Sequence, residues 1–276
     1  MAMQDIFQAI GSLDAAGVKR IVDRLEYRGK DETFVEMREE YLRQMNLPSE
    51  ASILDLGCGT GVVTRALAAR EGFSGSVTGI DYSPELISAA KRLAEEEGVA
   101  DRVEFRVGDA QSVEDEDESY DAVILHTVVS HVPDPGAVVS EAARILKPGG
   151  SVAIFDGDYA SLTYAATDHE FDAEMVQALL SNIVANPYIM RELPTILRTS
   201  GLQLTSFYSN VLAEVGVGQF FSSLAESYVP IIVRAQLISE EKAEDWLNGV
   251  RQASSNKNIF ASCNYYTYIA QRPETL

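Results

Sequence analysis

The stretch ILDLGCGTG at residues 53–61 constrains the fold more than any other part of the chain. A short apolar run reaches Asp55, and three glycines follow at alternate positions, Gly57, Gly59 and Gly61. Apolar residues then recur at helical spacing. Glycine is needed where the backbone takes unusual dihedral angles or where a ligand approaches it closely. The stretch therefore predicts a strand, a tight turn and a helix whose first N–H groups face a ligand.

The spacing of the glycines separates two classes of nucleotide-binding loop. The dinucleotide fingerprint G-x-G-x-x-G would place its third glycine at position 62, where this chain has Val62. A nicotinamide-dependent oxidoreductase therefore remains only a second hypothesis for an enzyme. A purely structural turn is the third interpretation of the loop taken alone.

From Ala51 onward the pattern alternates between strands and helices, which predicts an α/β fold with a parallel sheet. We expect strands near residues 76–80, 103–107, 120–125, 152–155, 203–208 and 260–269. Ligands of such sheets bind beyond the carboxyl ends of the strands. Four acidic or imidazole side chains collect at those ends: Asp55, Asp81, Asp109 and His126. One ligand site is therefore expected there.

Four ordered motifs within residues 51–156 carry a resemblance to a known family. They are DLGCGTG at 55–61, GDA at 108–110, LHTVVSHVPDP at 125–135 and LKPGG at 146–150. The stretch resembles the class I S-adenosylmethionine (SAM)-dependent methyltransferases, and is similar to the small-molecule enzymes of ubiquinone and menaquinone biosynthesis. The resemblance implies a Rossmann-like seven-stranded sheet with helices on both faces and an antiparallel seventh strand beside the sixth.

The resemblance also implies roles in binding SAM. Asp81 would accept from the ribose hydroxyls, Asp109 from the adenine amino group, and the Ala110 N–H would donate to the adenine ring. The Gly57 carbonyl, with Asp55 through water, would suit the methionine ammonium. The expected cofactor-binding set is Asp55, Gly57, Cys58, Gly59, Thr60, Gly61, Asp81, Tyr82, Asp109, Ala110 and His126.

Segments outside the resemblance are expected to cover the cofactor. Residues 1–48 are predicted to form an N-terminal helical cover, with a polar connection at 25–30, and residues 49–276 to form the methyltransferase domain. Helical insertions are expected near 157–188 and 219–256. Aromatic residues there would form a wall of the substrate pocket, although for any single one packing of the extra helices is the favoured explanation. The candidate substrate-binding residues are Tyr27, Arg28, Tyr159 and Tyr164.

A methyl group on a sulfonium is already activated, so a base is needed only if the acceptor arrives protonated. His131 is the first candidate because imidazole titrates near neutrality and this residue follows the fourth strand. Packing against the turn at 133–135 is its rival explanation. Asp156 and Asp158 are the alternative bases, and His126 is expected to serve the cofactor through its backbone.

Composition narrows the partners. The net charge of −20 argues against nucleic acid and anionic membranes, and no His, Cys, Asp and Glu cluster has metal-site spacing. With two distant cysteines and no export signal, we expect reduced thiols and a cytoplasmic protein. The preferred function is methyl transfer to an O, N or C atom of a small metabolite. A SAM-binding protein without transfer activity is the alternative, and the oligomeric state stays open, a homodimer being one option.

Overall fold

The computed structural model describes residue 7 and residues 10–274. Its helices are α1 (Ala15–Lys30), α2 (Glu32–Met45), α3 (Val62–Ala68), α4 (Pro84–Glu96), α5 (Pro135–Ile145), α6 (His169–Ile183), α7 (Ile189–Thr199), α8 (Phe220–Arg234) and α9 (Glu240–Ser255). Its strands are β1 (Ser52–Leu56), β2 (Ser76–Asp81), β3 (Val103–Val107), β4 (Tyr120–His126), β5 (Leu146–Ala165), β6 (Gln203–Gly216) and β7 (Ile259–Gln271). Among these residues no helix is long and apolar enough to cross a membrane.

The strands form one seven-stranded sheet in the order β3-β2-β1-β4-β5-β7-β6. Strands β1 to β5 pair in parallel, while β7 pairs antiparallel with both β5 and β6. The order reverses beside β1, so β1 and β4 diverge at the topological switch point where such sheets bind ligands. The predicted Rossmann-like sheet with an antiparallel seventh strand beside the sixth is confirmed.

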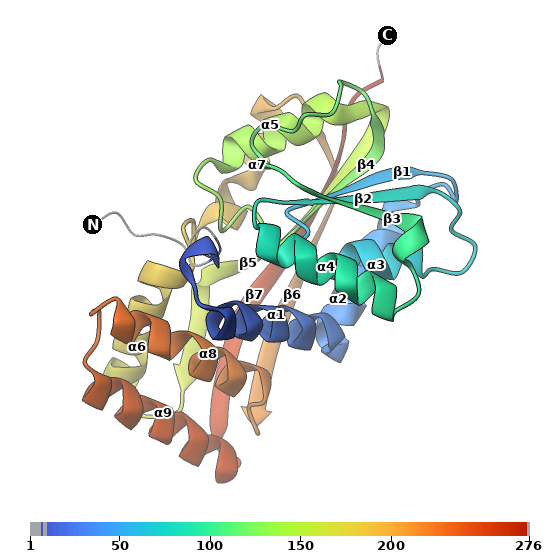
Figure 1. Ribbon diagram of the computed structural model, residues 1–276. Helices are drawn as coiled ribbons and strands as arrows, with labels where there is room; N and C mark the ends of the chain where they lie inside the picture. The colour runs from blue at the N-terminus through green and yellow to red at the C-terminus, as the bar shows by residue number, and fades with distance from the viewer. Residues whose placement is uncertain (1–6, 8–9, 275–276) are drawn as a thin grey trace.

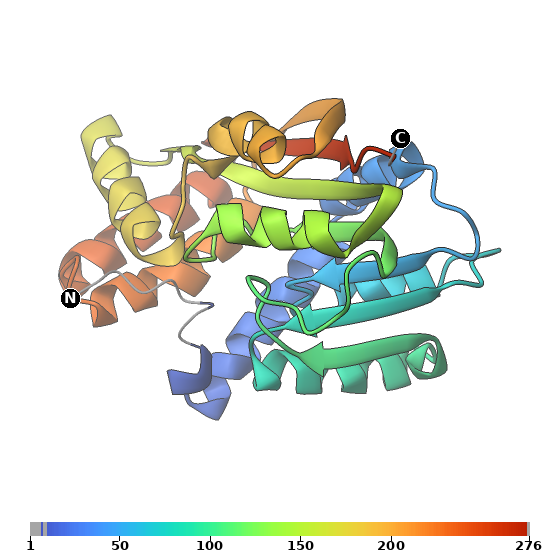
Figure 2. The ribbon, with the colours of Figure 1, turned by 90° about the horizontal axis from the view of Figure 1, so that it is seen from above.

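Alternate residues of the central strands supply two cores, and helices lie on both faces of the sheet (Figures 1 and 2). Ile53 and Ile124 pack with α2 and α3 on one face, and Leu54 and Val123 pack with α5 and α7 on the other. Both faces are therefore covered, which explains the nearly continuous apolar runs of β1 and β4.

The last three strands extend well past the rest of the sheet. β5 runs through residue 165 and β6 through residue 216, and both stay paired with β7. The helices α6, α8 and α9 pack on one face of this extension, at the end of the molecule away from β2 and β3 (Figures 1 and 2). The expected helical insertion near 157–188 is therefore only partly helical, because its first nine residues continue β5.

The N-terminal helices lie against the sheet. Phe34, Met37, Tyr41 and Met45 are all buried on α2, as the helical spacing predicts. Residues 25–30, however, form the last turns of α1 and are not a connection. The break between the two helices falls at Asp31, whose carboxylate accepts from the backbone N–H groups of Thr33 and Phe34 at the start of α2.

Candidate active site

The glycine loop joins β1 to α3 in the predicted conformation. Gly57, Gly59 and Gly61 all have positive φ values, +78°, +56° and +77°. A Cβ on Gly57 would lie 2.6 Å from Cγ2 of Val128, and one on Gly61 would lie 2.6 Å from the ring of Phe105. The first glycine therefore lets the loop approach the end of β4, and the third lets it pack on β3.

A cavity of about 420 Å³ opens at the carboxyl ends of the strands. Ten of the eleven expected cofactor-binding residues line it together with Ile80: Asp55, Gly57, Cys58, Gly59, Thr60, Asp81, Tyr82, Asp109, Ala110 and His126. The eleventh, Gly61, does not line it. No group of three or more His, Cys, Asp or Glu in the described part of the chain could hold a metal ion.

Asp55 has one bonded and one unpaired carboxylate oxygen. Its Oδ2 accepts from the N–H and the hydroxyl of Thr64, at 3.1 and 2.6 Å. Its Oδ1 is buried without a hydrogen-bond partner. Burial, with a smaller contribution from the charge of Asp81, raises the pKa of this carboxyl to about 6, although the two hydrogen bonds from Thr64 oppose the shift. A cationic group in the cavity would stabilise the ionised form of Asp55, so this part of the cavity suits an ammonium group.

Asp81 connects the end of β2 to two neighbouring segments. Its two carboxylate oxygens accept from the N–H groups of Gly59, at 2.8 Å, and Ser83, at 2.9 Å. Burial raises the pKa of this carboxyl, and the two N–H donors oppose the shift. Asp109 accepts from the N–H of Gln111 at 2.9 Å in the turn after β3. Both acids are held by backbone donors beside the glycine loop.

His126 is a packed residue of the cavity wall. Its Nδ1 is hydrogen-bonded to the hydroxyl of Tyr41 at 3.0 Å, and its ring stacks on Phe155 with centroids 4.7 Å apart. Burial, followed by the positive charges of Arg28 and Arg38, lowers the pKa of the imidazole well below its usual value. The side chain is therefore neutral near pH 7.

His131 lies in the cavity wall, as expected from its position after β4. Its backbone N–H donates to the Val128 carbonyl at 2.9 Å, which closes the turn that follows the strand. The ring lies 4.5 Å from that of Phe7 and 6.1 Å from that of Tyr159, measured between centroids. The imidazole is thus brought to the same cavity as the glycine loop.

The two alternative bases lie elsewhere. Asp156 is fully buried and accepts from the N–H groups of Ser130 and Gly157, at 3.1 and 2.8 Å. Asp158 is buried and forms a salt bridge with Arg191 at 2.8 Å. Neither carboxylate lines the cavity. Asp156 nevertheless interacts with a residue of the cavity wall. Burial raises the pKa of its carboxyl, and the charge of His131 opposes that shift.

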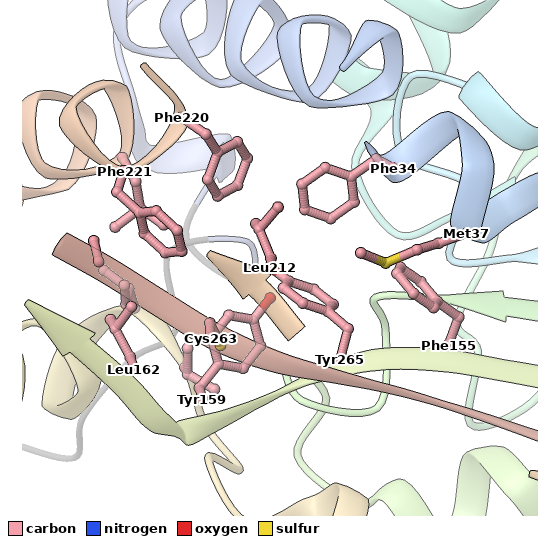
Figure 3. Close-up of a cluster of buried hydrophobic side chains, with 14 of the residues drawn as sticks. Phe34, Met37, Phe155, Tyr159, Leu162, Leu212, Phe220, Phe221, Cys263 and Tyr265 are labelled. Atoms are coloured by element: carbon pink, nitrogen blue, oxygen red, sulfur yellow. The ribbon is translucent and has the colours of Figure 1, made fainter. Parts of the chain in front are cut away.

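Of the four candidate substrate-binding residues, only Arg28 lines the cavity. Tyr27 is 40% exposed on the outer side of α1. Tyr159 and Tyr164 are buried in the core beneath the extra helices, where Tyr164 donates its hydroxyl hydrogen to the Phe221 carbonyl at 2.8 Å. Figure 3 shows Tyr159 in this aromatic cluster beside Tyr265. The three tyrosines thus do not line this cavity, and their role in binding a substrate stays a prediction.

The N-terminal helices instead supply cavity residues that the sequence pattern did not single out. Leu25 and Gly29 of α1 and Phe34 and Arg38 of α2 line the cavity. A signal was present on α2, because Arg38 lies three residues before Tyr41 on the apolar face. On α1 no such signal was recognised, because residues 25–30 were expected to form a connection and not the last turns of a helix.

Comparison with known proteins agrees with this geometry. The profile of a methyltransferase-domain family matches residues 47–211, more than half of the chain. A ubiquinone biosynthesis O-methyltransferase of Xanthomonas axonopodis pv. citri is 34% identical over 175 residues, which cover 61% of this chain and 69% of that protein. A demethylmenaquinone methyltransferase of Lactiplantibacillus plantarum is 37% identical over 112 residues, 41% and 47% of the two chains. For several curated relatives the chain spans only about half of their length.

Solved structures share the fold at lower identity. Phosphoethanolamine N-methyltransferase 2 of Haemonchus contortus, solved with SAM, superposes with a TM-score of 0.53 at 21% identity and covers 87% of this chain and 53% of its own. The cyclase SpnF superposes with a TM-score of 0.57 at 17% identity and covers 90% of this chain and 85% of its own. The glycine loop, the sheet order and the matched domain together establish that this chain belongs to the class I SAM-dependent methyltransferase family.

Proposed function

We propose that this chain transfers the methyl group of SAM to an O, N or C atom of a small-molecule metabolite. The observation that carries the proposal is one cavity in which the acids beside the glycine loop meet Arg28 of the covering helix α1 and His131 of the turn after β4. Such a cavity can hold the cofactor and an acceptor next to each other. The relatives named for ubiquinone and menaquinone biosynthesis support a small-molecule acceptor.

The residues present fit SAM. The buried, unpaired Oδ1 of Asp55 suits a nearby ammonium, and Gly59, which lines the cavity, lets a ligand approach the loop backbone closely. Asp81 would accept from the ribose hydroxyls, and Asp109 with the Ala110 N–H would hold the adenine. Bound SAM supplies an electrophilic methyl group on a positively charged sulfonium.

The chain's own residues would then position the acceptor and exclude water. Two contacts hold α1 over the cavity: Glu26 accepts from the Thr60 hydroxyl at 2.7 Å, and Arg28 donates to the Thr127 hydroxyl at 2.7 Å. His131 would take a proton from an acceptor that arrives protonated, with Asp156 behind it favouring the imidazolium that forms. Asp156 is thus a positioning residue in this proposal.

A SAM-binding protein that steers a different reaction is the second candidate. We retain this candidate because the fold also resembles that of SpnF, which is named as a cyclase. Titration calorimetry with SAM, S-adenosylhomocysteine (SAH) and NAD tests the cofactor, and only SAM and SAH are expected to bind. Turnover of a labelled methyl group separates the two SAM-dependent candidates.

We also propose that two copies of the chain pair through β6. This strand lies at an edge of the sheet, and its seven odd-numbered residues are exposed and uncharged: Gln203, Thr205, Phe207, Ser209, Val211, Ala213 and Val215. An edge strand presents unpaired backbone groups, and two identical strands can pair antiparallel about a twofold axis. On a chain with a net charge of −20, two copies repel each other least along an uncharged surface.

A cytoplasmic location is the last part of the proposal. Cys58 and Cys263 are both buried free thiols, a state that a reducing compartment maintains. Burial raises the pKa of each thiol, so neither is a ready nucleophile.

A further inference from the structure

Two arginines line the cavity of a strongly acidic protein. Arg28 comes from α1 and Arg38 from α2, and they are the only lysines or arginines among the described lining residues. A cation is costly to desolvate, so an arginine in a cavity wall usually meets an anion. The cofactor and the acceptor are the two ligands that could bring one.

Arg38 lies at the cofactor end of the cavity. It precedes Tyr41 by one helical turn, and the Tyr41 hydroxyl reaches His126 at the end of β4. The charges of Asp55 and Arg38 both act on the Tyr41 hydroxyl, so the three groups are neighbours. The methionine end of SAM is a zwitterion, and its carboxylate must lie within a few bonds of the ammonium that Asp55 suits. Arg38 is thus placed to meet the carboxylate of the cofactor.

Arg28 faces a different part of the cavity. Its Nη2 donates to the hydroxyl of Thr127, just past β4, and its guanidinium lies 5.8 Å from the ring of Phe34. Its charge lowers the pKa values of Tyr159 and Tyr265, which burial raises. Figure 3 shows Phe34 pointing from α2 toward Phe220 and Tyr265. Arg28 therefore lies on the aromatic side of the cavity, beside Thr127 and near His126.

The guanidinium of Arg28 has unused hydrogen-bonding capacity. It carries five N–H donors, and among the described residues it donates to one hydroxyl and forms no ion pair with an acidic side chain. The flat face of Phe34 lies beside it as an apolar wall. A planar molecule with an oxyanion at one edge would satisfy both features, because guanidinium binds carboxylates in a two-pronged geometry.

We propose that Arg28 binds an oxyanion of the methyl acceptor, so that the substrate is a small aromatic molecule carrying a carboxylate or a phenolate. This inference rests on the proposed methyl transfer and names the class of acceptor. Arg28 is a specificity-determining residue in this account. The contact with Thr127 holds its guanidinium in place. Helix α1, which contacts the glycine loop through Glu26, carries Arg28 at the edge of the cavity.

The experiment measures ligand binding to the protein saturated with SAH, by calorimetry near pH 8. Benzoate and 4-nitrophenolate are the anionic probes, and benzamide is the neutral probe of the same shape. The wild-type complex should bind one of the anions at least about tenfold more tightly than benzamide, as a charge-assisted hydrogen bond would give. Arg28→Gln should abolish that preference, and Arg28→Lys should restore part of it.

Matched variants separate this site from the cofactor site. Lys30→Gln removes the same charge from an exposed position of α1 and should leave the preference for anions unchanged. Arg38→Gln should weaken SAH about tenfold but not 5′-methylthioadenosine, which lacks the carboxylate. Arg28→Gln should leave SAH affinity within about twofold of wild type.

Each contrary result has its own meaning. If SAH binds the wild-type protein but neither anion is preferred over benzamide, the class of acceptor is wrong and the cofactor assignment survives. If Arg28→Gln loses SAH affinity while keeping the preference for anions, Arg28 serves the cofactor and the inference fails. If SAH itself does not bind, the proposed function fails first.

Discussion

Asp55 is a titratable group in the cavity wall, and binding of the cofactor should change its protonation state. Because burial raises its carboxyl pKa to about 6, Asp55 is largely protonated below that pH in the empty protein. A bound ammonium favours the carboxylate, so binding should release a proton. SAH affinity should therefore rise as the pH increases from 5 toward 7 and then level off. Calorimetry in buffers of different ionisation enthalpy measures both the affinity and the released proton.

Asp55→Asn is the matched control for that prediction, since it keeps the shape and the contact with Thr64 but removes the charge. Its SAH affinity should be lower near pH 7 and flat with pH. A variant that retained the wild-type pH profile would show that another group titrates.

The same pKa shift has a consequence for the empty protein. A carboxyl whose pKa rises on folding, from about 3.8 toward 6, binds more protons folded than unfolded between those values. Its contribution to the free energy of unfolding therefore falls as the pH rises through that window. Asp55→Asn should remove this loss, so its stability relative to wild type should increase between pH 4 and pH 7, as denaturant titrations at each pH would measure.

Asp81 should matter for binding through two effects. Asp81→Ala removes the proposed ribose acceptor and also the acceptor for the Gly59 N–H, which shapes the loop. With charge-assisted hydrogen bonds contributing about 1.5–3 kcal/mol each, SAH affinity should fall about a hundredfold or more. Asp81→Glu should lose far less, and Asp101→Ala, on the exposed surface, should lose nothing. Wild-type affinity in Asp81→Ala would place the ribose elsewhere.

His131 is tested in the chemical step. If it removes a proton from the acceptor, His131→Ala and His131→Gln should lower single-turnover methyl transfer about 10²–10⁴-fold while SAH affinity is retained. His126→Gln is the comparison, because that imidazole is held by Tyr41 with a pKa well below its usual value. Rates within a few-fold of wild type in the His131 variants would mean that the acceptor needs no base from this residue.

At the scale of elements, α1 is connected to the loop it covers. Glu26 accepts from the Thr60 hydroxyl and from the buried guanidinium of Arg65, at 2.7 and 2.6 Å. Glu26→Ala removes both contacts, so the amides of α1 should exchange hydrogen several-fold faster. Asp23→Ala, on the same helix and paired only with exposed Lys19, should exchange like wild type. Adding SAH should slow exchange in α1 of the wild-type protein. Equal exchange in all three proteins would show that Glu26 does not fasten the helix.

The sequence predicted an element well when the residues that the element contacts are close to it in the chain, and poorly when they are far away. The glycine loop and the acids at the carboxyl ends of β1, β2 and β3 were predictable, because each strand and the turn that follows it are adjacent in the sequence. The long course of β5 was not, since residues 157–165 are held as a strand by β7, about a hundred positions later. The same reason explains why the sequence did not reveal the salt bridge of Asp158, since no local pattern shows that the distant Arg191 pairs with it.

At the scale of the whole molecule, the proposed pairing through β6 predicts the mass in solution. Light scattering should give a species of about twice 30.2 kDa for the wild type. Val211→Asp puts a charge in the middle of the exposed β6 face, where two copies would bring it close to its symmetry mate, and should yield the monomer. Val107→Asp makes the same change at the other edge of the sheet and should stay dimeric. The interface would be refuted if the wild type were monomeric, or if the Val211→Asp and Val107→Asp variants had the same mass in solution.

Methyl transfer is the central claim, and one measurement tests it most directly. The protein is incubated with SAM carrying a trideuterated methyl group and a metabolite extract supplemented with aromatic acids and phenols, and the products are analysed by mass spectrometry. The account predicts a labelled product formed in equal amount with SAH, and no such product with Asp81→Ala. Tight SAH binding without any labelled product would contradict it, and would make this chain a SAM-binding protein that does not transfer the methyl group.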